Sequence, residues 1–166
     1  MIHFLSISLF PLLMIVAGVG DALSFRIPNW LTLSIAAAFF PLALATGMPL
    51  EAFGLHVLTG VILFVVGFVM FSAGLFGGGD AKLLAAAGLW FGSAHAIPFL
   101  VFTVVTGGIL ALIVALWSII GLYFEIHDGP WLKKITSLRP NVPYGYAFAV
   151  GALLAFPQTW WMGASG

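Results

Sequence analysis

The sequence predicts an all-α, polytopic membrane protein, and three observations lead to this fold class. Hydrophobic residues make up 63% of the chain and charged residues only 6%, a balance that a water-soluble core of this size cannot hide. The apolar stretches are long and continuous, whereas the strands of a membrane barrel alternate apolar and polar residues. No soluble domain, internal repeat or low-complexity linker interrupts them, so residues 1–166 are expected to form a single membrane-embedded domain.

Six apolar stretches are candidates for helices that cross about 30 Å of hydrocarbon, which takes roughly 20 residues each. In chain order they are approximately 4–20, 30–48, 53–76, 81–91 or slightly beyond, 97–124 and 143–161. The fourth is short, so Asp80 and Lys82 at its start should lie at the headgroup boundary or just beneath it. The connections are short except for a polar loop over 125–141.

The first stretch has a second interpretation, as a cleaved signal peptide with small residues near Ala17 and Gly18. A signal peptide needs a basic residue before its apolar run, and no Lys or Arg precedes this one. A membrane-spanning helix is therefore favoured.

The basic residues indicate how the six spans are oriented. Lys and Arg resist translocation, whereas acidic residues count for little. With six spans, all five basic residues fall on one side, which is then the cytoplasmic side: Arg26, Lys82, Lys133, Lys134 and Arg139. Both termini are then expected outside. If any one internal span were absent, the five basic residues would fall on both faces of the membrane. This supports the interpretation of the short fourth stretch as a span.

Two acidic residues border apolar spans at the same predicted face. Asp21 follows the first span and Asp80 precedes the fourth, so the topology places them level with each other. The other acidic residues lie in polar loops, where solvation explains them: Glu51, Glu125 and Asp128. One interpretation is that Asp21 and Asp80 are solvated helix ends. The other is that they are functional, as acids at membrane depth usually are.

The backbone around both acids favours the functional interpretation. Gly77, Gly78 and Gly79 permit positive φ and close approach of another chain, and predict an irregular segment that lines a cavity. Pro28 disfavours helical geometry at the preceding residue and can open the second span, so a tight turn should hold Arg26 near Asp21.

Two carboxylates brought within a few ångströms share a proton, which is the arrangement of the aspartic proteases. The ionised member takes a proton from water while the protonated member polarises the scissile carbonyl. The chain has no cysteine, and no serine lies in a nucleophile-elbow pattern.

Three motifs resemble those of the type IV prepilin peptidases, the GxGD class of membrane aspartic proteases. "DALSFRIPNW" (21–30) resembles the first motif, an aspartate followed by I-P-N, and "GGGDAKLLAAAGLWFG" (77–92) resembles the second, including the lysine after the acid. "VPYGYAFAVG" (142–151) is similar to the C-terminal pattern. The motifs occur in the family's order, and the six spans cover almost the whole chain.

The resemblance implies that Asp21 and Asp80 are a catalytic pair. It also implies that the protein removes basic leader peptides from prepilins or pilin-like secretion subunits, at the cytoplasmic face of the inner membrane. The chain lacks the long members' insertion with paired cysteines, so it is similar to the short, peptidase-only type of tight-adherence pili, without N-methylation. We expect supporting or substrate-binding roles for the other motif residues: Gly77, Gly78, Gly79, Lys82, Arg26, Pro28 and Asn29.

Two other functions stay open at this point: a small proton-coupled transporter using the same acids, and a non-catalytic subunit of a pilus or secretion apparatus. Transporter sites usually lie near the midplane between repeats, whereas these acids lie at one face and no repeat is visible. We expect no nucleic-acid partner because the net charge is zero without a basic tract. We expect no cofactor and no metal, because the histidines share no ligand spacing: His3, His56, His95 and His127.

Overall fold

The computed structural model describes residues 2–123 and 142–163, and the regular elements of this part are all helices. The predicted all-α fold class is confirmed for these residues. The helices are α1 (Ile2–Ser24), α2 (Asn29–Ala45), α3 (Leu50–Ser72), α4 (Gly78–Tyr123), α6 (Tyr144–Ala155), the 3-10 turn η1 (Phe156–Gln158) and α7 (Trp160–Gly163).

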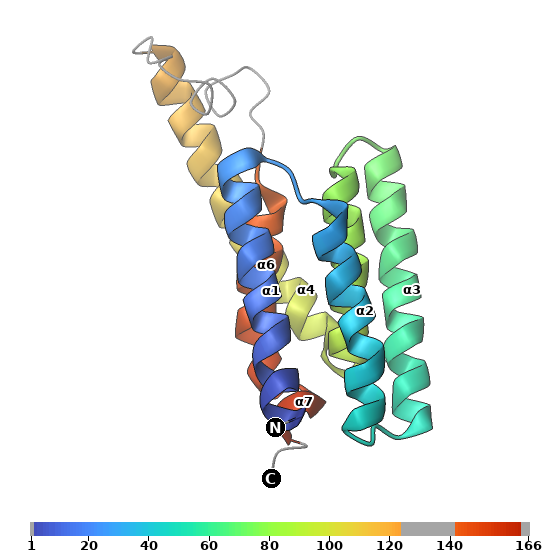
Figure 1. Ribbon diagram of the computed structural model, residues 1–166. Coiled ribbons are helices and arrows are strands. Elements are labelled where there is room, and N and C mark those ends of the chain that lie inside the picture. The colour runs from blue at the N-terminus through green and yellow to red at the C-terminus, as the bar shows by residue number, and fades with distance from the viewer. Residues whose placement is uncertain (1, 124–141, 164–166) are drawn as a thin grey trace.

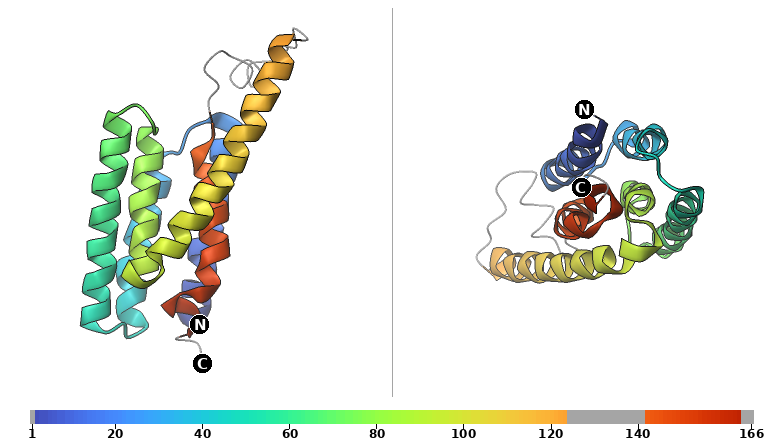
Figure 2. Two further views of the ribbon diagram at one scale, coloured as in Figure 1. Left: turned by 180° about the vertical axis from the view of Figure 1, so that it is seen from behind. Right: turned by 90° about the horizontal axis from the view of Figure 1, so that it is seen from below.

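Helix α4 contains two of the predicted spans, joined at one residue. Gly92 has φ 60° and ψ −176°, and the chain reverses its direction there (Figure 2). A Cβ on Gly92 would lie 2.6 Å from the imidazole of His56, so only glycine fits this turn. The predicted stretches 81–91 and 97–124 are therefore two arms of α4, and the connection between them is shorter than the sequence suggested.

The two arms of α4 pack against different helices. The first arm lies against α3, where Gly67 approaches Ala81 and Gly60 approaches Leu89. The second arm crosses α6, where Gly151 approaches Thr103, and its C-terminal end leans away from the other helices (Figures 1 and 2). Helices α1 and α6 also pack together.

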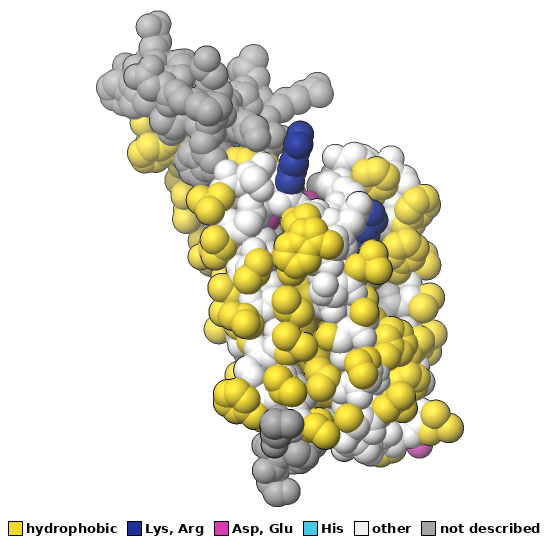
Figure 3. Space-filling model, in the orientation of Figure 1, with side chains coloured by type: hydrophobic (Ala, Val, Ile, Leu, Met, Phe, Trp, Pro, Cys, Tyr) yellow, Lys and Arg dark blue, Asp and Glu magenta, His cyan; other side chains and the backbone are white. Residues whose placement is uncertain are grey.

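In the part of the chain that the structure describes, three helices are long and apolar enough to cross a membrane by length and composition: residues Phe4–Ser24 of α1, α3, and residues Gly78–Ile120 of α4. Helix α2 is apolar but shorter. The lateral surface carries large exposed apolar side chains, and Lys and Arg appear at one end of the visible face (Figure 3). The apolar helices indicate a membrane protein, and the arrangement of six spans with both termini outside stays a prediction.

The predicted single span over 143–161 is wrong in detail. Helix α6 ends at Ala155, and Pro157 follows inside η1 before α7 begins at Trp160. Proline has no N–H to continue an α-helix, which accounts for the break.

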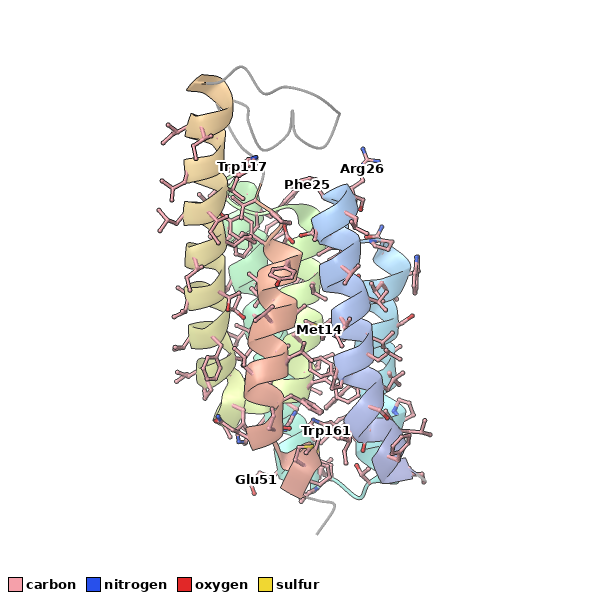
Figure 4. All side chains as sticks on the ribbon, turned by 90° about the vertical axis from the view of Figure 1, so that its left-hand side faces the viewer. Met14, Phe25, Arg26, Glu51, Trp117 and Trp161 are labelled. Atoms are coloured by element: carbon pink, nitrogen blue, oxygen red, sulfur yellow. The ribbon has the colours of Figure 1, made fainter. Side chains whose placement is uncertain are left out.

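Aromatic side chains from several helices pack together at the end of the bundle opposite Arg26 (Figure 4). Trp161, labelled there, is fully buried and donates its indole N–H to the carbonyl of Trp90 at 2.8 Å. The Trp90 indole in turn donates to the carbonyl of Ile35 at 2.9 Å. His56 stacks on Phe39 with ring centroids 5.6 Å apart. Helices α2, α3, α4 and α7 are joined here, so this end is a rigid base for the site at the other end.

The whole loop over 125–141 lies outside the described residues, and so do several residues discussed above: Glu125, His127, Asp128, Lys133, Lys134 and Arg139.

Candidate active site

Asp21 lies in the last turn of α1, since this helix continues to Ser24 and not only to residue 20 as expected. Its side chain is 5% exposed, and Oδ2 accepts a hydrogen bond of 2.8 Å from the backbone N–H of Gly145. The backbone of Tyr146 provides a second hydrogen bond. Both N–H groups belong to the first turn of α6, whose own cap residue, Pro143, has no capping side chain. Asp21 therefore caps α6 from another helix.

Asp80 is the third residue of α4 and is half-buried. Its Oδ2 accepts a hydrogen bond of 3.1 Å from the backbone N–H of Gly77, the residue before the helix. This contact is half of a capping box, and a carboxylate in the first helical turn is also favoured by the helix dipole. The other oxygen, Oδ1, is buried and has no hydrogen-bond partner among the described residues. Capping thus accounts for one oxygen of Asp80 and leaves the second open to a ligand.

The two carboxylates line the same cavities. A cavity of about 570 Å³ is bounded by Asp21, Asp80, the three glycines and residues of the turn between α1 and α2. A second cavity, of about 420 Å³, is also lined by Asp21 and Asp80 and reaches Phe76 and Tyr144. The two acids are close enough to interact electrostatically. They face a common space large enough for a peptide segment, at the end of the bundle that carries Arg26.

The glycine segment differs from the expected irregular loop. Gly78 and Gly79 already belong to α4, and the left-handed residue of this connection is Gly74, with φ 72°. What Gly79 provides is close approach, since a Cβ there would lie 3.0 Å from Cβ of Ile27 and 3.2 Å from its carbonyl oxygen. None of these three glycines has a positive φ, because Asp80 caps the helix at Gly77 and helical geometry begins at Gly78, but all three line the cavity as expected.

The turn after Asp21 begins with a strained aromatic residue. The N–H of Phe25 donates to the carbonyl of Asp21 at 2.7 Å, which ends α1. Phe25 has φ 55°, the only positive φ of a non-glycine residue in the described part of the chain. Glycine usually occupies this position, and a larger residue costs roughly 1 kcal/mol or more. Phe25 also lines both cavities that contain Asp21 and Asp80.

The other predicted residues of this turn border the cavity. Pro28, with φ −68° and ψ 142°, immediately precedes α2 as expected. Arg26 lines the cavity, is exposed, and points outward at this end (Figure 4).

Lys82 connects the two motifs in a way that the sequence did not reveal. Its Nζ donates a hydrogen bond of 2.8 Å to Oδ1 of Asn29. Asn29 is the first residue of α2, eight positions after Asp21, and Lys82 lies two positions after Asp80. This contact ties α2 to the first turn of α4.

Sequence reasoning missed Gly145, although it lies in the C-terminal motif. A Cβ at this position would lie 2.9 Å from both Cβ and Oδ2 of Asp21 and 2.7 Å from Cδ1 of Ile27. The C-terminal motif includes Gly145, but the sequence does not show that Gly145 contacts Asp21, because the two residues are 124 positions apart. It also missed Phe25, whose strain no residue pattern signals.

A sequence comparison now adds to this geometry. The profile of the type IV leader peptidase family matches residues 8–112, more than half of the chain, including both Asp21 and Asp80. The chain belongs to the type IV leader peptidase family. Membership in this family implies a protease, a leader peptidase of the aspartic type. No curated protein and no solved structure matches the chain.

The donor set at this candidate site consists of carboxylates and backbone N–H groups. In the described part of the chain, no cluster of three or more His, Cys, Asp or Glu side chains is found. The chemistry that these residues can perform is general acid and base catalysis by two carboxyl groups.

Proposed function

We propose that the protein is an aspartic endopeptidase that cuts basic leader peptides from prepilins or pilin-like secretion subunits, at the cytoplasmic boundary of the inner membrane. The observation that carries this proposal is that carboxylates from two separate motifs line one cavity, with one buried oxygen that has no hydrogen-bond partner within residues 2–123 and 142–163. Asp21 and Asp80 are the proposed catalytic pair.

The pair shares one proton in this mechanism. The ionised carboxylate takes a proton from a water molecule, whose oxygen attacks the scissile carbonyl carbon, while the protonated carboxyl donates a hydrogen bond to the carbonyl oxygen. As the tetrahedral intermediate collapses, the proton passes to the leaving amine, the C–N bond breaks, and the shared proton is restored. The N–H groups of Gly77 and Gly145 hold one oxygen of each acid in place, so the geometry is preorganised.

The position of the acids favours a peptidase over a transporter. Asp21 is in the last turn of α1 and Asp80 in the first turn of α4, so both lie at one end of the bundle. A proton-coupled transporter would place its acids near the midplane. A non-catalytic assembly subunit would not need a pair of acids around a peptide-sized cavity.

Substitution by asparagine separates catalysis from capping. Asparagine accepts the same hydrogen bonds from Gly145 and Gly77 and caps helices about as well as aspartate, so the fold should survive. It cannot exchange a proton, so Asp21→Asn and Asp80→Asn should each abolish cleavage. The experiment coexpresses each form with a prepilin-type precursor and determines the mature N-terminus by mass spectrometry.

Wild-type protein should release the leader, and both variants should leave the precursor intact while accumulating in membranes at the wild-type level. Near-normal processing by either variant would refute the assignment of the pair.

A further inference from the structure

An apolar groove lies beside the proposed catalytic cavity, between the second arm of α4 and the adjoining ends of α1 and α6. Its volume is about 660 Å³, and the described residues that line it include no charged side chain. On α4 its wall runs from Thr106 to Trp117, which is about 16 Å, or three turns, at 1.5 Å per residue. Ala22 and Tyr146 form the opposite wall.

Phe25 joins this groove to the acids. It lines the groove and both cavities that contain Asp21 and Asp80. Figure 4 shows Phe25 and Trp117 at the same end of the bundle as Arg26. Phe25 is the strained residue at which glycine would suit the backbone better, and its ring lies where the groove meets the two cavities. Tyr146 also connects the two spaces, because it lines the groove while its backbone bonds Asp21.

We propose that this groove binds the apolar helical segment of the substrate that adjoins the scissile bond, and that Phe25 seats it. The proposal rests on the function proposed above. A peptide cut between the two acids must leave the cavity along a continuous surface, and the groove is the apolar surface that shares Phe25 with that cavity. An uncharged groove three helical turns long fits a segment that is helical and apolar.

The first test fills the groove and measures cleavage of two substrates. Ile113 lines the groove and is 55% exposed, whereas its neighbour Leu112 is 61% exposed and does not line it. Ile113→Trp should raise KM about tenfold for a precursor that contains the apolar segment, with kcat nearly unchanged. For a short peptide that spans only the leader and the cleavage site, kcat/KM should stay at the wild-type value. The matched control Leu112→Trp should leave both substrates unaffected.

Substituting Phe25 tests its part in seating the segment. Phe25→Gly should keep or raise thermal stability, because it relieves the strained φ, while KM for the long precursor rises at least fivefold. Phe25→Tyr should restore the wild-type KM. A stability loss with equal effects on both substrates would assign Phe25 a structural role and refute this part of the proposal.

Crosslinking tests the groove without requiring catalysis. A photoreactive phenylalanine derivative replaces either Trp117, a large aromatic that lines the groove, or its neighbour Leu116, which does not line it, in the Asp80→Asn background. The protein is held in lipid nanodiscs with the precursor. Crosslinks to the apolar segment from 117 but not from 116 support the groove. Crosslinks from 117 only to lipid, to a second copy or to this chain's own loop would overturn it. This readout separates the two proposals, since the precursor can occupy the groove even if wild-type protein cuts nothing.

Discussion

Replacing Gly145 with alanine is the most specific perturbation that the structure offers. The new methyl group would lie 2.9 Å from Oδ2 of Asp21 and 2.7 Å from Cδ1 of Ile27. Both separations are too short for carbon contacts, so Asp21 or the start of α6 has to move. The same change disturbs the 2.8 Å hydrogen bond that holds Asp21.

The expected size of the effect follows from these contacts. Overpacking of a buried site typically costs about 1–3 kcal/mol of stability. A displacement of a catalytic group by about 1 Å costs on the order of 100-fold in rate. Gly145→Ala should therefore fold, with a lower melting temperature, and lose roughly two orders of magnitude in kcat.

The assay compares purified Gly145→Ala with Gly108→Ala, using a prepilin-type precursor in detergent or nanodiscs. A methyl group on Gly108 meets nothing within 4 Å, and alanine is a better helix former, so this control should be fully active and stabilised by about 0.5–1 kcal/mol. Wild-type kcat in Gly145→Ala would refute the claim that this glycine positions Asp21.

Two further predictions concern the supports of Asp80. Lys82→Met and Asn29→Ala should each lower kcat about tenfold, because each removes the same hydrogen bond between the two side chains. The double variant should therefore have the same kcat as either single variant. Additive losses of kcat in this double-mutant cycle would contradict the prediction. Gly79→Ala should lower kcat by a similar factor, because its methyl group would lie 3.0 Å from Cβ of Ile27. The control Gly54→Ala should keep the wild-type kcat, because a methyl group there meets nothing within 4 Å. Equal cleavage rates for the two variants would argue against the contact between Gly79 and Ile27.

Much of the fold could be predicted because composition dominates it. In lipid, a continuous apolar stretch can satisfy its backbone hydrogen bonds by forming a helix. The apolar stretches therefore predicted the approximate positions of α1, α2, α3 and both arms of α4. The connections were predicted less well. The direct joint at Gly92 depends on the His56 side chain of another helix, and nothing in the local sequence shows such a contact.

The candidate site shows the same division. Asp21 and Asp80 could be selected because a carboxylate beside an apolar span requires a reason. Their surroundings could not, because Gly145 and the contact of Lys82 with Asn29 arise only when distant segments meet. The sequence suggested two reasons for the glycines at 77–79, and the structure shows one of them, the close approach at Gly79, while none of the three has a left-handed backbone.

The central claim is that Asp21 and Asp80 act as one catalytic unit. The most direct measurement is the single-turnover cleavage rate of a purified precursor by Asp21→Asn, by Asp80→Asn and by the double variant, each confirmed as folded by its melting temperature. A unit that shares one proton predicts losses of about 1,000-fold or more in each single variant, and no further loss in the double variant. Retention of more than a tenth of the wild-type rate in either single variant would contradict the account.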